Sequence, residues 1–182
     1  MRKILSIIIL KILGWSWDKK KPTDEKYIIT VAPHTSKIDF IFGSLFGRAV
    51  GLRTNVLIKK EMFKFPLGII LRAFGGIPVD RTKNIGLADQ MIKEFNKRKS
   101  IILVITPEGT RKKSKRWKKG FYHIAEKTKV YIHLAYIDFK EKHMGFGPSF
   151  FPSGNYDEDM KILIDFYKDK TGKHPERFVL HG

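Results

Sequence analysis

Residues 101–105, Ile-Ile-Leu-Val-Ile, form an uninterrupted apolar run with a polar residue on either side, Ser100 and Thr106. Five aliphatic residues in a row, followed by a proline at position 107, predict a strand that is buried on both faces. Strands of this kind occur inside parallel sheets, where helices cover both faces. The run therefore favours a fold in which a sheet is enclosed between helices.

Apolar runs and amphipathic segments alternate along the rest of the chain, whose 182 residues suit one domain with a core of its own. The other expected strands are residues 27–32, 54–58, 77–79, 130–137 and 146–151. The expected helices are residues 37–50, 67–74, 85–99, 120–127 and 157–170. This alternation predicts an α/β fold, a single domain with a mostly parallel central sheet flanked by helices. Pro78 should lie at a sheet edge, because proline cannot donate to a ladder.

Two turns that directly follow predicted strands carry reactive side chains. Residues 33–39 contain His34 and, five positions later, Asp39, and residues 106–111 contain Glu108 and an arginine. Ligands of open α/β sheets bind beyond the carboxyl ends of the strands, so parallel strands would bring both turns to one edge. A histidine oriented by a carboxylate suits general-base catalysis, although a capping or packing histidine fits the same spacing.

The residues between this histidine and aspartate also suit the start of a helix. Thr35 or Ser36 is expected to cap the helix that follows. Ser36 is the nearest candidate for a protein nucleophile, and we interpret it as a cap. The sequence therefore predicts a site that works without a covalent intermediate on the protein.

The charge of the chain restricts its partners. With 36 Lys and Arg against 18 Asp and Glu, the formal net charge is +18 at pH 7. Such a field attracts polyanions, and nucleic acid and an anionic membrane surface are the two obvious choices. The absence of cysteine excludes disulfides and thiolate chemistry. We find no histidine and carboxylate spacing that predicts a metal site.

Residues 1–17 form a separate apolar segment with a basic start and with Trp15 and Trp17 at its end. It is too short to span a bilayer, which takes about 20 apolar residues. One side of such a helix gathers the residues Lys3, Ser6, Lys11 and Gly14. We predict an amphipathic helix in the membrane interface, its tryptophans at the headgroup boundary. The alternative is a helix packed on the domain or on a partner subunit. Residues 18–26 are expected to be a charged linker to a domain at 27–182.

Several of these stretches together resemble the glycerolipid acyltransferase family, the enzymes that acylate glycerol-3-phosphate and lysophosphatidate. The H-x-x-x-x-D of that family is matched by His34 and Asp39, and its P-E-G-T-R is complete at residues 107–111. Its G-x-x-x-x-R is matched by Gly76 to Arg81. Three blocks in the right order imply an α/β acyltransferase domain.

Other parts of the resemblance are weaker. The run that often precedes the second block is matched approximately, beginning with Lys60, and the fourth block is matched only loosely at residues 130–133. Thr106 and Lys112 replace the Phe and Ser that usually flank the third block. Since that block binds the acceptor in the family, the identity of the acceptor stays open.

The resemblance implies the transfer of an acyl group from a thioester to a lipid hydroxyl. His34 would take the hydroxyl proton, and Asp39 would hold the imidazole in the right tautomer. Backbone amides at the start of the helix at 37–50 would bind the oxyanion. No cofactor is implied, and the acyl donor would be an acyl carrier protein thioester or acyl-coenzyme A.

The resemblance also implies how a phosphorylated acceptor is bound. Arg111 and Arg81 would grip its phosphate, because a guanidinium matches phosphate oxygens bidentately. Gly109 would allow the backbone to approach the acceptor closely. Glu108 would bind a glycerol hydroxyl or organise Arg111. The implied substrate-binding set is Lys60, Arg81, Glu108, Gly109, Thr110 and Arg111. The alternatives are an ion pair with Asp80 for Arg81 and a solvated surface charge for Lys60.

We therefore predict an enzyme that converts lysophosphatidate to phosphatidate, with another lysolipid acceptor such as a lyso-aminolipid as the alternative. It would be peripheral or monotopic on the cytoplasmic face of an anionic membrane, with the basic loop at 112–119 and its Trp117 facing headgroups or an acidic acyl carrier. The candidates for an acyl tunnel, or for core packing, are Leu67, Ile69, Ile70, Leu71 and Phe74. A nucleic-acid-binding domain would explain the charge, but it leaves residues 33–39 and 107–111 without a role, so no nucleic acid is expected.

Overall fold

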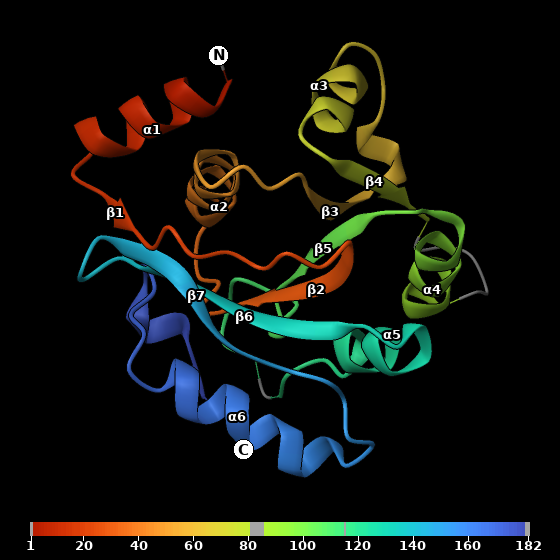
Figure 1. The fold of residues 1–182 in the computed structure, drawn as a ribbon. Helices are drawn as coiled ribbons and strands as arrows, with labels where there is room; N and C mark the ends of the chain where they lie inside the picture. The colour runs from red at the N-terminus through yellow and green to blue at the C-terminus, as the bar shows by residue number, and fades with distance from the viewer. Residues whose placement is uncertain (1, 81–85, 115, 181–182) are drawn as a thin grey trace.

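The computed structural model describes residues 2–80, 86–114 and 116–180, and within them seven strands form one sheet (Figure 1). The strands are β1 Ser16–Trp17, β2 Lys26–Val31, β3 Thr54–Lys59, β4 Gly76–Val79, β5 Ile101–Ile105, β6 Tyr131–Asp138 and β7 His143–Phe150. Their order is β1-β7-β6-β2-β5-β3-β4. All neighbours are parallel except β6 and β7. The predicted mostly parallel sheet is confirmed, with Pro78 in the edge strand β4.

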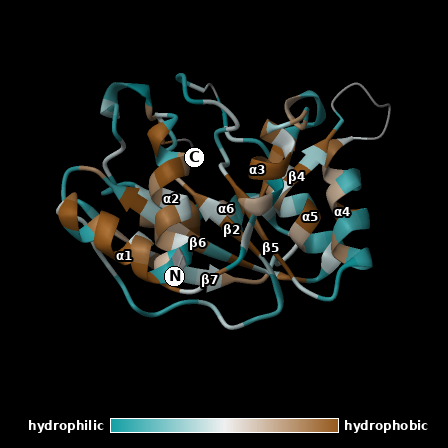
Figure 2. Cartoon of the chain, turned by 90° about the horizontal axis from the view of Figure 1, so that it is seen from above, coloured by the Kyte–Doolittle hydropathy of each residue, from teal (hydrophilic) through white to brown (hydrophobic). Residues whose placement is uncertain are grey.

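Helices cover both faces of this sheet. They are α1 Arg2–Ile12, α2 Ile38–Ala49, α3 Leu67–Ala73, α4 Leu87–Lys97, α5 Gly120–Thr128 and α6 Tyr156–Tyr167, with 3-10 turns η1 Lys60–Met62 and η2 Pro175–Arg177. α1 and α2 pack on one face, and α4, α5 and α6 pack on the other. Figure 2 views the molecule from the side that carries α1, α2 and α3. The alternation of strands and helices thus gave the correct fold class, with most element ends within three residues of the prediction.

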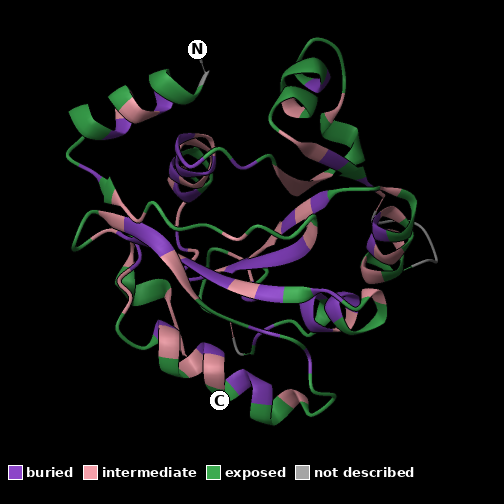
Figure 3. Cartoon of the chain, in the orientation of Figure 1, coloured by how far each residue is buried: buried purple, intermediate pink, exposed green. Residues whose placement is uncertain are grey.

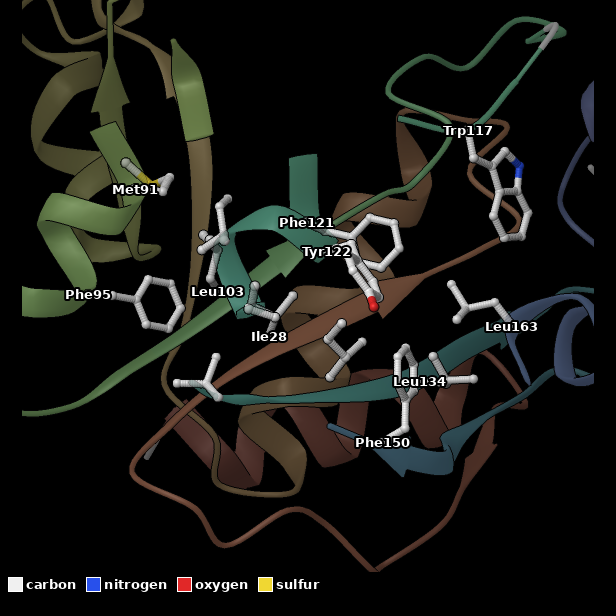
Figure 4. Packing of buried hydrophobic residues seen from close by; sticks show 14 of the residues in the cluster. Ile28, Met91, Phe95, Leu103, Trp117, Phe121, Tyr122, Leu134, Phe150 and Leu163 are labelled. Carbon is white, nitrogen blue, oxygen red and sulfur yellow. The ribbon is translucent and has the colours of Figure 1, made fainter. Parts of the chain in front are cut away.

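The larger core lies between the sheet and α4, α5 and α6. Ile28, Leu103 and Leu134 point into it from three adjacent strands and meet Phe95 and Phe121 of the helices (Figure 4). The strand β5 is nevertheless buried on one face only. Ile101 and Leu103 are buried, whereas Ile102, Val104 and Ile105 are half-buried. The prediction of burial on both faces is therefore wrong for the α2 side, where β3 also has no fully buried residue.

The N-terminal segment is shorter as a helix than predicted and partly belongs to the domain. α1 ends at Ile12, and β1 joins the sheet beside β7. Leu10 and Trp15 are buried, and Trp15 packs against Phe42 at 4.4 Å between ring centroids. The placement of Trp15 at a headgroup boundary is therefore wrong, because its ring completes the second core.

The outer side of α1 remains exposed (Figure 3). It carries the large apolar residues Ile4, Leu5, Ile8 and Ile12, with Leu13 just beyond the helix. Ser6 and Leu10 face the domain instead, so this side of the helix fits the alternative of a helix packed on the domain, whereas insertion of the outer side into a membrane interface stays a prediction. In the described part of the chain, no helix has the length and apolar content needed to cross a membrane.

The basic loop at 112–119 contains a second tryptophan whose position was predicted wrongly. Trp117 is only 5% exposed and packs against Tyr167 and Phe178, with centroids 6.0 and 6.3 Å away. The expectation that Trp117 faces headgroups is wrong, because its ring is buried against these two aromatic side chains of the core. The neighbouring lysines 112, 113, 118 and 119 are exposed.

Candidate active site

The two predicted turns meet at the carboxyl edge of the sheet. β2 and β5 are parallel neighbours, with Thr30 opposite Ile105, so the segments that follow them leave the sheet side by side. The backbone N–H of His34 donates to Oε1 of Glu108 at 2.6 Å. The prediction that both turns share one edge is confirmed by this contact.

The imidazole of His34 is held by a buried carboxylate. Its Nδ1 lies 3.0 Å from Oδ2 of Asp39, and the same oxygen accepts the backbone N–H groups of Thr35 and Ser36 at 2.9 Å each. A carboxylate can only accept, so Nδ1 carries the ring proton and Nε2 is left as an acceptor. The side chain of Asp39 is 4% exposed and that of His34 is 19% exposed. This pair therefore has the geometry of a general base that a substrate can reach.

The hydroxyl of Ser36, one of the two residues expected to cap this helix, accepts the backbone N–H of Ile38 at the start of α2 at 3.3 Å. Lys37 is the N-cap residue and makes no side-chain capping bond. The amides of Thr35 and Ser36 are instead committed to Asp39, which fixes the turn around the imidazole. Binding of an oxyanion by amides at the start of this helix stays a prediction, and the N–H groups of Thr35 and Ser36 are the least suited to it.

A segment near the C-terminus holds the same turn from the other side. The hydroxyl of buried Thr35 accepts the backbone N–H of His174 at 3.0 Å, and its carbonyl accepts from the Arg177 guanidinium at 3.4 Å. A Cβ on Gly172 would lie 2.8 Å from the Thr35 hydroxyl, so this close packing requires glycine. Sequence reasoning missed these residues, because no local pattern links positions 139 residues apart.

Glu108 is the most perturbed carboxyl group of the site. It is 2% exposed, and this burial raises its pKa from 4.5 to about 7. The hydrogen bond from the His34 N–H opposes the rise, and the charge of Asp39 adds to it. The structure thus joins Glu108 to the backbone of His34, a contact that neither expected role included. A bond from Glu108 to a glycerol hydroxyl stays a prediction.

Exchanging Glu108 for glutamine is expected to change how stability depends on pH. Between pH 4.5 and about 7, the folded protein binds more protons at Glu108 than the unfolded chain does. The free energy of unfolding therefore falls as pH rises through this window, by at most about 3 kcal/mol. Glutamine keeps the acceptor oxygen for the His34 N–H but cannot ionise. Glu108→Gln should match the wild type at low pH and exceed its stability above neutral pH.

Urea unfolding at about pH 5 and about pH 8 measures this difference. The exposed Glu126 of α5 supplies the matched control, since Glu126→Gln should follow the wild type at both values. Parallel pH dependence in wild type and Glu108→Gln would show that Glu108 is already ionised in the folded protein across this range.

The rest of the second turn presents cationic and polar groups to solvent. Gly109 has φ of +64°, and its N–H closes the turn on the Thr106 carbonyl at 3.0 Å. The hydroxyl of Thr110 accepts the backbone N–H of Lys112 at 3.3 Å. Arg111 is exposed and forms no ion pair within the described residues. Its guanidinium is thus available at the edge where His34 lies.

The two remaining predicted residues follow the neighbouring strands. Lys60 begins η1 directly after β3, and its Nζ lies 3.9 Å from Oδ2 of Asp80. Its side chain is largely exposed, as the alternative of a surface charge expected. A role of Lys60 in substrate binding stays a prediction. Arg81 lies outside the described residues. Within those residues, no group of three His, Asp or Glu side chains has the arrangement of a metal site.

Residues 18–137 match the family model described as Acyltransferase, which is more than half of the chain. The chain belongs to the acyltransferase family. The matched residues contain both turns and β2 to β5, so the family resemblance drawn from the sequence motifs is confirmed. Residues 172–177, which hold the turn of Thr35 in place, lie beyond the matched residues.

The fold also resembles that of a solved acyltransferase. The crystal structure of the 1-acyl-sn-glycerophosphate acyltransferase PlsC from Thermotoga maritima matches with a TM-score of 0.64 and 17% sequence identity. The match covers 94% of this chain and 80% of that one. At this identity the likeness concerns the fold alone. A comparison with curated proteins gives no match.

The apolar residues of α3 that were expected to line an acyl tunnel or the core are mostly exposed. Ile69 and Ile70 lie on the surface, as do Leu67 and Phe74, whereas Leu71 is half-buried. The core-packing alternative is therefore wrong for the four exposed residues. Tunnel lining stays a prediction for the acyltransferase.

Proposed function

We propose that this acyltransferase moves a fatty acyl group from an acyl thioester to the free hydroxyl of a lysophospholipid, with lysophosphatidate as the leading acceptor. The observation that carries the proposal is the His34–Asp39 pair. Asp39 is buried and fixes Nδ1 of His34, while the ring stays partly exposed at the edge of the sheet. Nε2, the remaining ring nitrogen, is then the atom that would accept the proton of a substrate hydroxyl.

The proposed reaction needs only these two side chains for proton transfer. Nε2 of His34 takes the hydroxyl proton as the oxygen attacks the thioester carbonyl, and the buried carboxylate of Asp39 stabilises the imidazolium. The tetrahedral intermediate collapses with cleavage of the C–S bond. The imidazolium returns its proton to the departing thiolate, which leaves as a thiol. The acyl donor would be an acyl carrier protein thioester or acyl-coenzyme A.

We assign the phosphate of the acceptor to Arg111, with Arg81 and Lys60 as further cations. Arg111 follows the turn of Glu108, whose carboxyl group contacts His34, and it is exposed without an ion pair in the described residues. A guanidinium binds phosphate in two parallel hydrogen bonds. The acceptor would then be held by its headgroup at the edge where the base lies.

Replacing Arg111 by alanine should therefore weaken acceptor binding. Hydrogen bonds to charged groups contribute about 1.5–3 kcal/mol, so the KM for lysophosphatidate should rise about 10- to 100-fold with a smaller change in kcat. Steady-state kinetics with acceptor and donor varied separately measure this. Arg116→Ala, in the same loop and also exposed, should leave this KM unchanged. An unchanged KM in Arg111→Ala would remove Arg111 from the phosphate site.

The identity of the acceptor is tested with the purified protein and an acyl thioester. Lysophosphatidate should yield phosphatidate, which chromatography of the extracted lipids detects. A lyso-aminolipid is the alternative acceptor, because Thr106 and Lys112 depart from the usual flanks of the acceptor block. Transfer to the lyso-aminolipid without formation of phosphatidate would favour that alternative, and no transfer to any lysolipid would refute the proposed activity.

We also propose that the enzyme is peripheral or monotopic on the cytoplasmic face of an anionic membrane. The exposed apolar side of α1 and the net charge of +18 support this placement. It would hold the enzyme at a bilayer that contains its lipid acceptor.

A further inference from the structure

A cavity of about 530 Å³ opens at the edge of the sheet opposite the proposed active site. It is bordered by Thr54 and Gly75, which lie at the amino ends of β3 and β4. His34 and Glu108, in contrast, follow the carboxyl ends of β2 and β5. Because these four strands are parallel, the cavity and the His34 site lie at opposite ends of the strands.

The lining of this cavity is cationic. Lys3 of α1, Arg48 of α2, Arg53 of the loop before β3 and Arg72 of α3 all border it, and among the described residues no aspartate or glutamate does. In the described part of the chain, Lys3, Arg53 and Arg72 form no ion pair. Lys21 adds a further cation, since its Nζ donates to the carbonyl of the lining residue Gly51 at 3.4 Å. Clefts lined by one sign of charge concentrate the opposite ion.

Part of the lining is held in place before any ligand arrives. The Arg48 guanidinium donates to the Ser44 carbonyl at 3.0 Å and lies 4.2 Å from the centroid of the Phe74 ring, which links α2 to α3. The Asn55 amide donates to the Gly75 carbonyl at 3.3 Å. An arginine that is stacked and hydrogen-bonded is already ordered, so it loses less side-chain entropy when a phosphate binds beside it.

The helices around the cavity expose apolar side chains. Ile4 and Ile8 of α1 lie on the surface, as do Ile69 and Ile70 of α3. Figure 2 looks onto α1 and α3 from outside and shows apolar stretches on both. Exposed apolar residues around a cluster of cations are typical of a surface that rests on an anionic membrane. A soluble anion would not require the apolar border.

We propose that this cavity binds the phosphate of an anionic phospholipid headgroup, at a site separate from the one that holds the acceptor. Its volume lies in the range of small-molecule sites, which is about 300–1,000 Å³. The bound lipid would anchor the protein on the bilayer between α1 and α3. This assignment does not rest on acyl transfer by His34.

The double substitution Arg53→Gln and Arg72→Gln in the full chain tests the assignment. Co-sedimentation with vesicles of phosphatidylcholine, with and without phosphatidylglycerol, gives the affinity. The double variant should lose about 30-fold in affinity for the anionic vesicles, the effect of two basic residues near such a surface, and little for the neutral ones. The matched control is Lys93→Gln with Lys97→Gln, two exposed lysines of α4. An equal loss in both double variants, or no loss in either, would overturn the assignment.

A second measurement separates the possible sources of the phosphate. The backbone amide resonances of Thr54, Asn55 and Gly75 are followed by NMR during titration with water-soluble dihexanoylphosphatidylglycerol, inorganic phosphate or a short DNA duplex. Saturable shifts with the lipid at concentrations where inorganic phosphate has no effect support the headgroup site. Equal shifts with inorganic phosphate, or shifts only with DNA, would overturn it.

The same double variant distinguishes this site from the proposed active site. With a lysolipid dissolved as monomer, Arg53→Gln with Arg72→Gln should transfer acyl groups at the wild-type rate. A wild-type protein without any transferase activity would refute the proposed function while leaving the vesicle and NMR results to decide the headgroup site. A monomer rate that falls as far as the vesicle affinity would instead make the cavity part of the catalytic machinery and overturn its separate role.

Discussion

Replacing His34 by alanine is expected to reduce acyl transfer by about 10²–10⁴-fold, the usual contribution of a positioned general base. The fold should persist, because the imidazole is partly exposed and its removal leaves no deep cavity in the core. The rate is measured as kcat/KM with lysophosphatidate and an acyl thioester, and far-UV circular dichroism reports the fold. Asp39→Asn should also cause a large loss, because an amide does not fix the imidazole tautomer in the same way.

The chain contains a matched control for this experiment. Nε2 of His133 lies 3.2 Å from Oδ2 of Asp24, and its side chain is 13% exposed, close to the value for His34. His133 is nevertheless away from the two turns, on β6. His133→Ala should therefore keep the wild-type rate. A His34→Ala rate within about tenfold of wild type would contradict a role as general base.

Substituting the outer side of α1 is expected to move the protein from membranes into solution. The triple variant Ile4→Gln, Ile8→Gln and Ile12→Gln changes three exposed residues without adding charge. Burial of an isoleucine side chain contributes about 1.5–3 kcal/mol, so the vesicle partition coefficient should fall by about 10³-fold or more if all three enter the interface. Co-sedimentation with vesicles measures the change.

Deletion of residues 1–17 would be a poorer test, because it would also remove the buried side chains of Leu10 and Trp15 from the core. Tyr131→Gln with Phe151→Gln is the control, since these two exposed aromatic residues lie outside α1, on β6 and just beyond β7. If the triple variant binds vesicles as tightly as the wild type, the basic surface alone is sufficient and α1 is not an anchor.

The features that local sequence patterns predicted are those that depend on neighbouring residues. The apolar run Ile101–Ile105 predicted a strand with the observed ends, because the run and the polar residues that bound it are all local in the sequence. The His34–Asp39 contact also lies within one turn, so its spacing together with the family motifs was sufficient to predict it. The shared edge of the two turns followed from the rule for parallel sheets, which needs only the order of strands and helices.

The features that were missed depend on residues far apart in the chain. The contact of Glu108 with the His34 backbone joins positions 74 apart, and the contact of Thr35 with His174 spans 139. Trp117 was predicted to be exposed from its lysine neighbours, but its burial is decided by Tyr167 and Phe178. No local periodicity encodes such pairings, and only the assembled fold supplies them.

The hydrogen bonds from His174 and Arg177 to Thr35 have a consequence for protein synthesis. Chains fold from the N-terminus as they are made, at about 5–20 residues per second. α1 emerges before the histidine turn, and residues 174–177, which hold that turn in place, emerge well after both. A nascent chain that bound a bilayer through α1 would do so before the turn that carries His34 is held in place. Competence for catalysis would then arise only after residues 174–177 have left the ribosome.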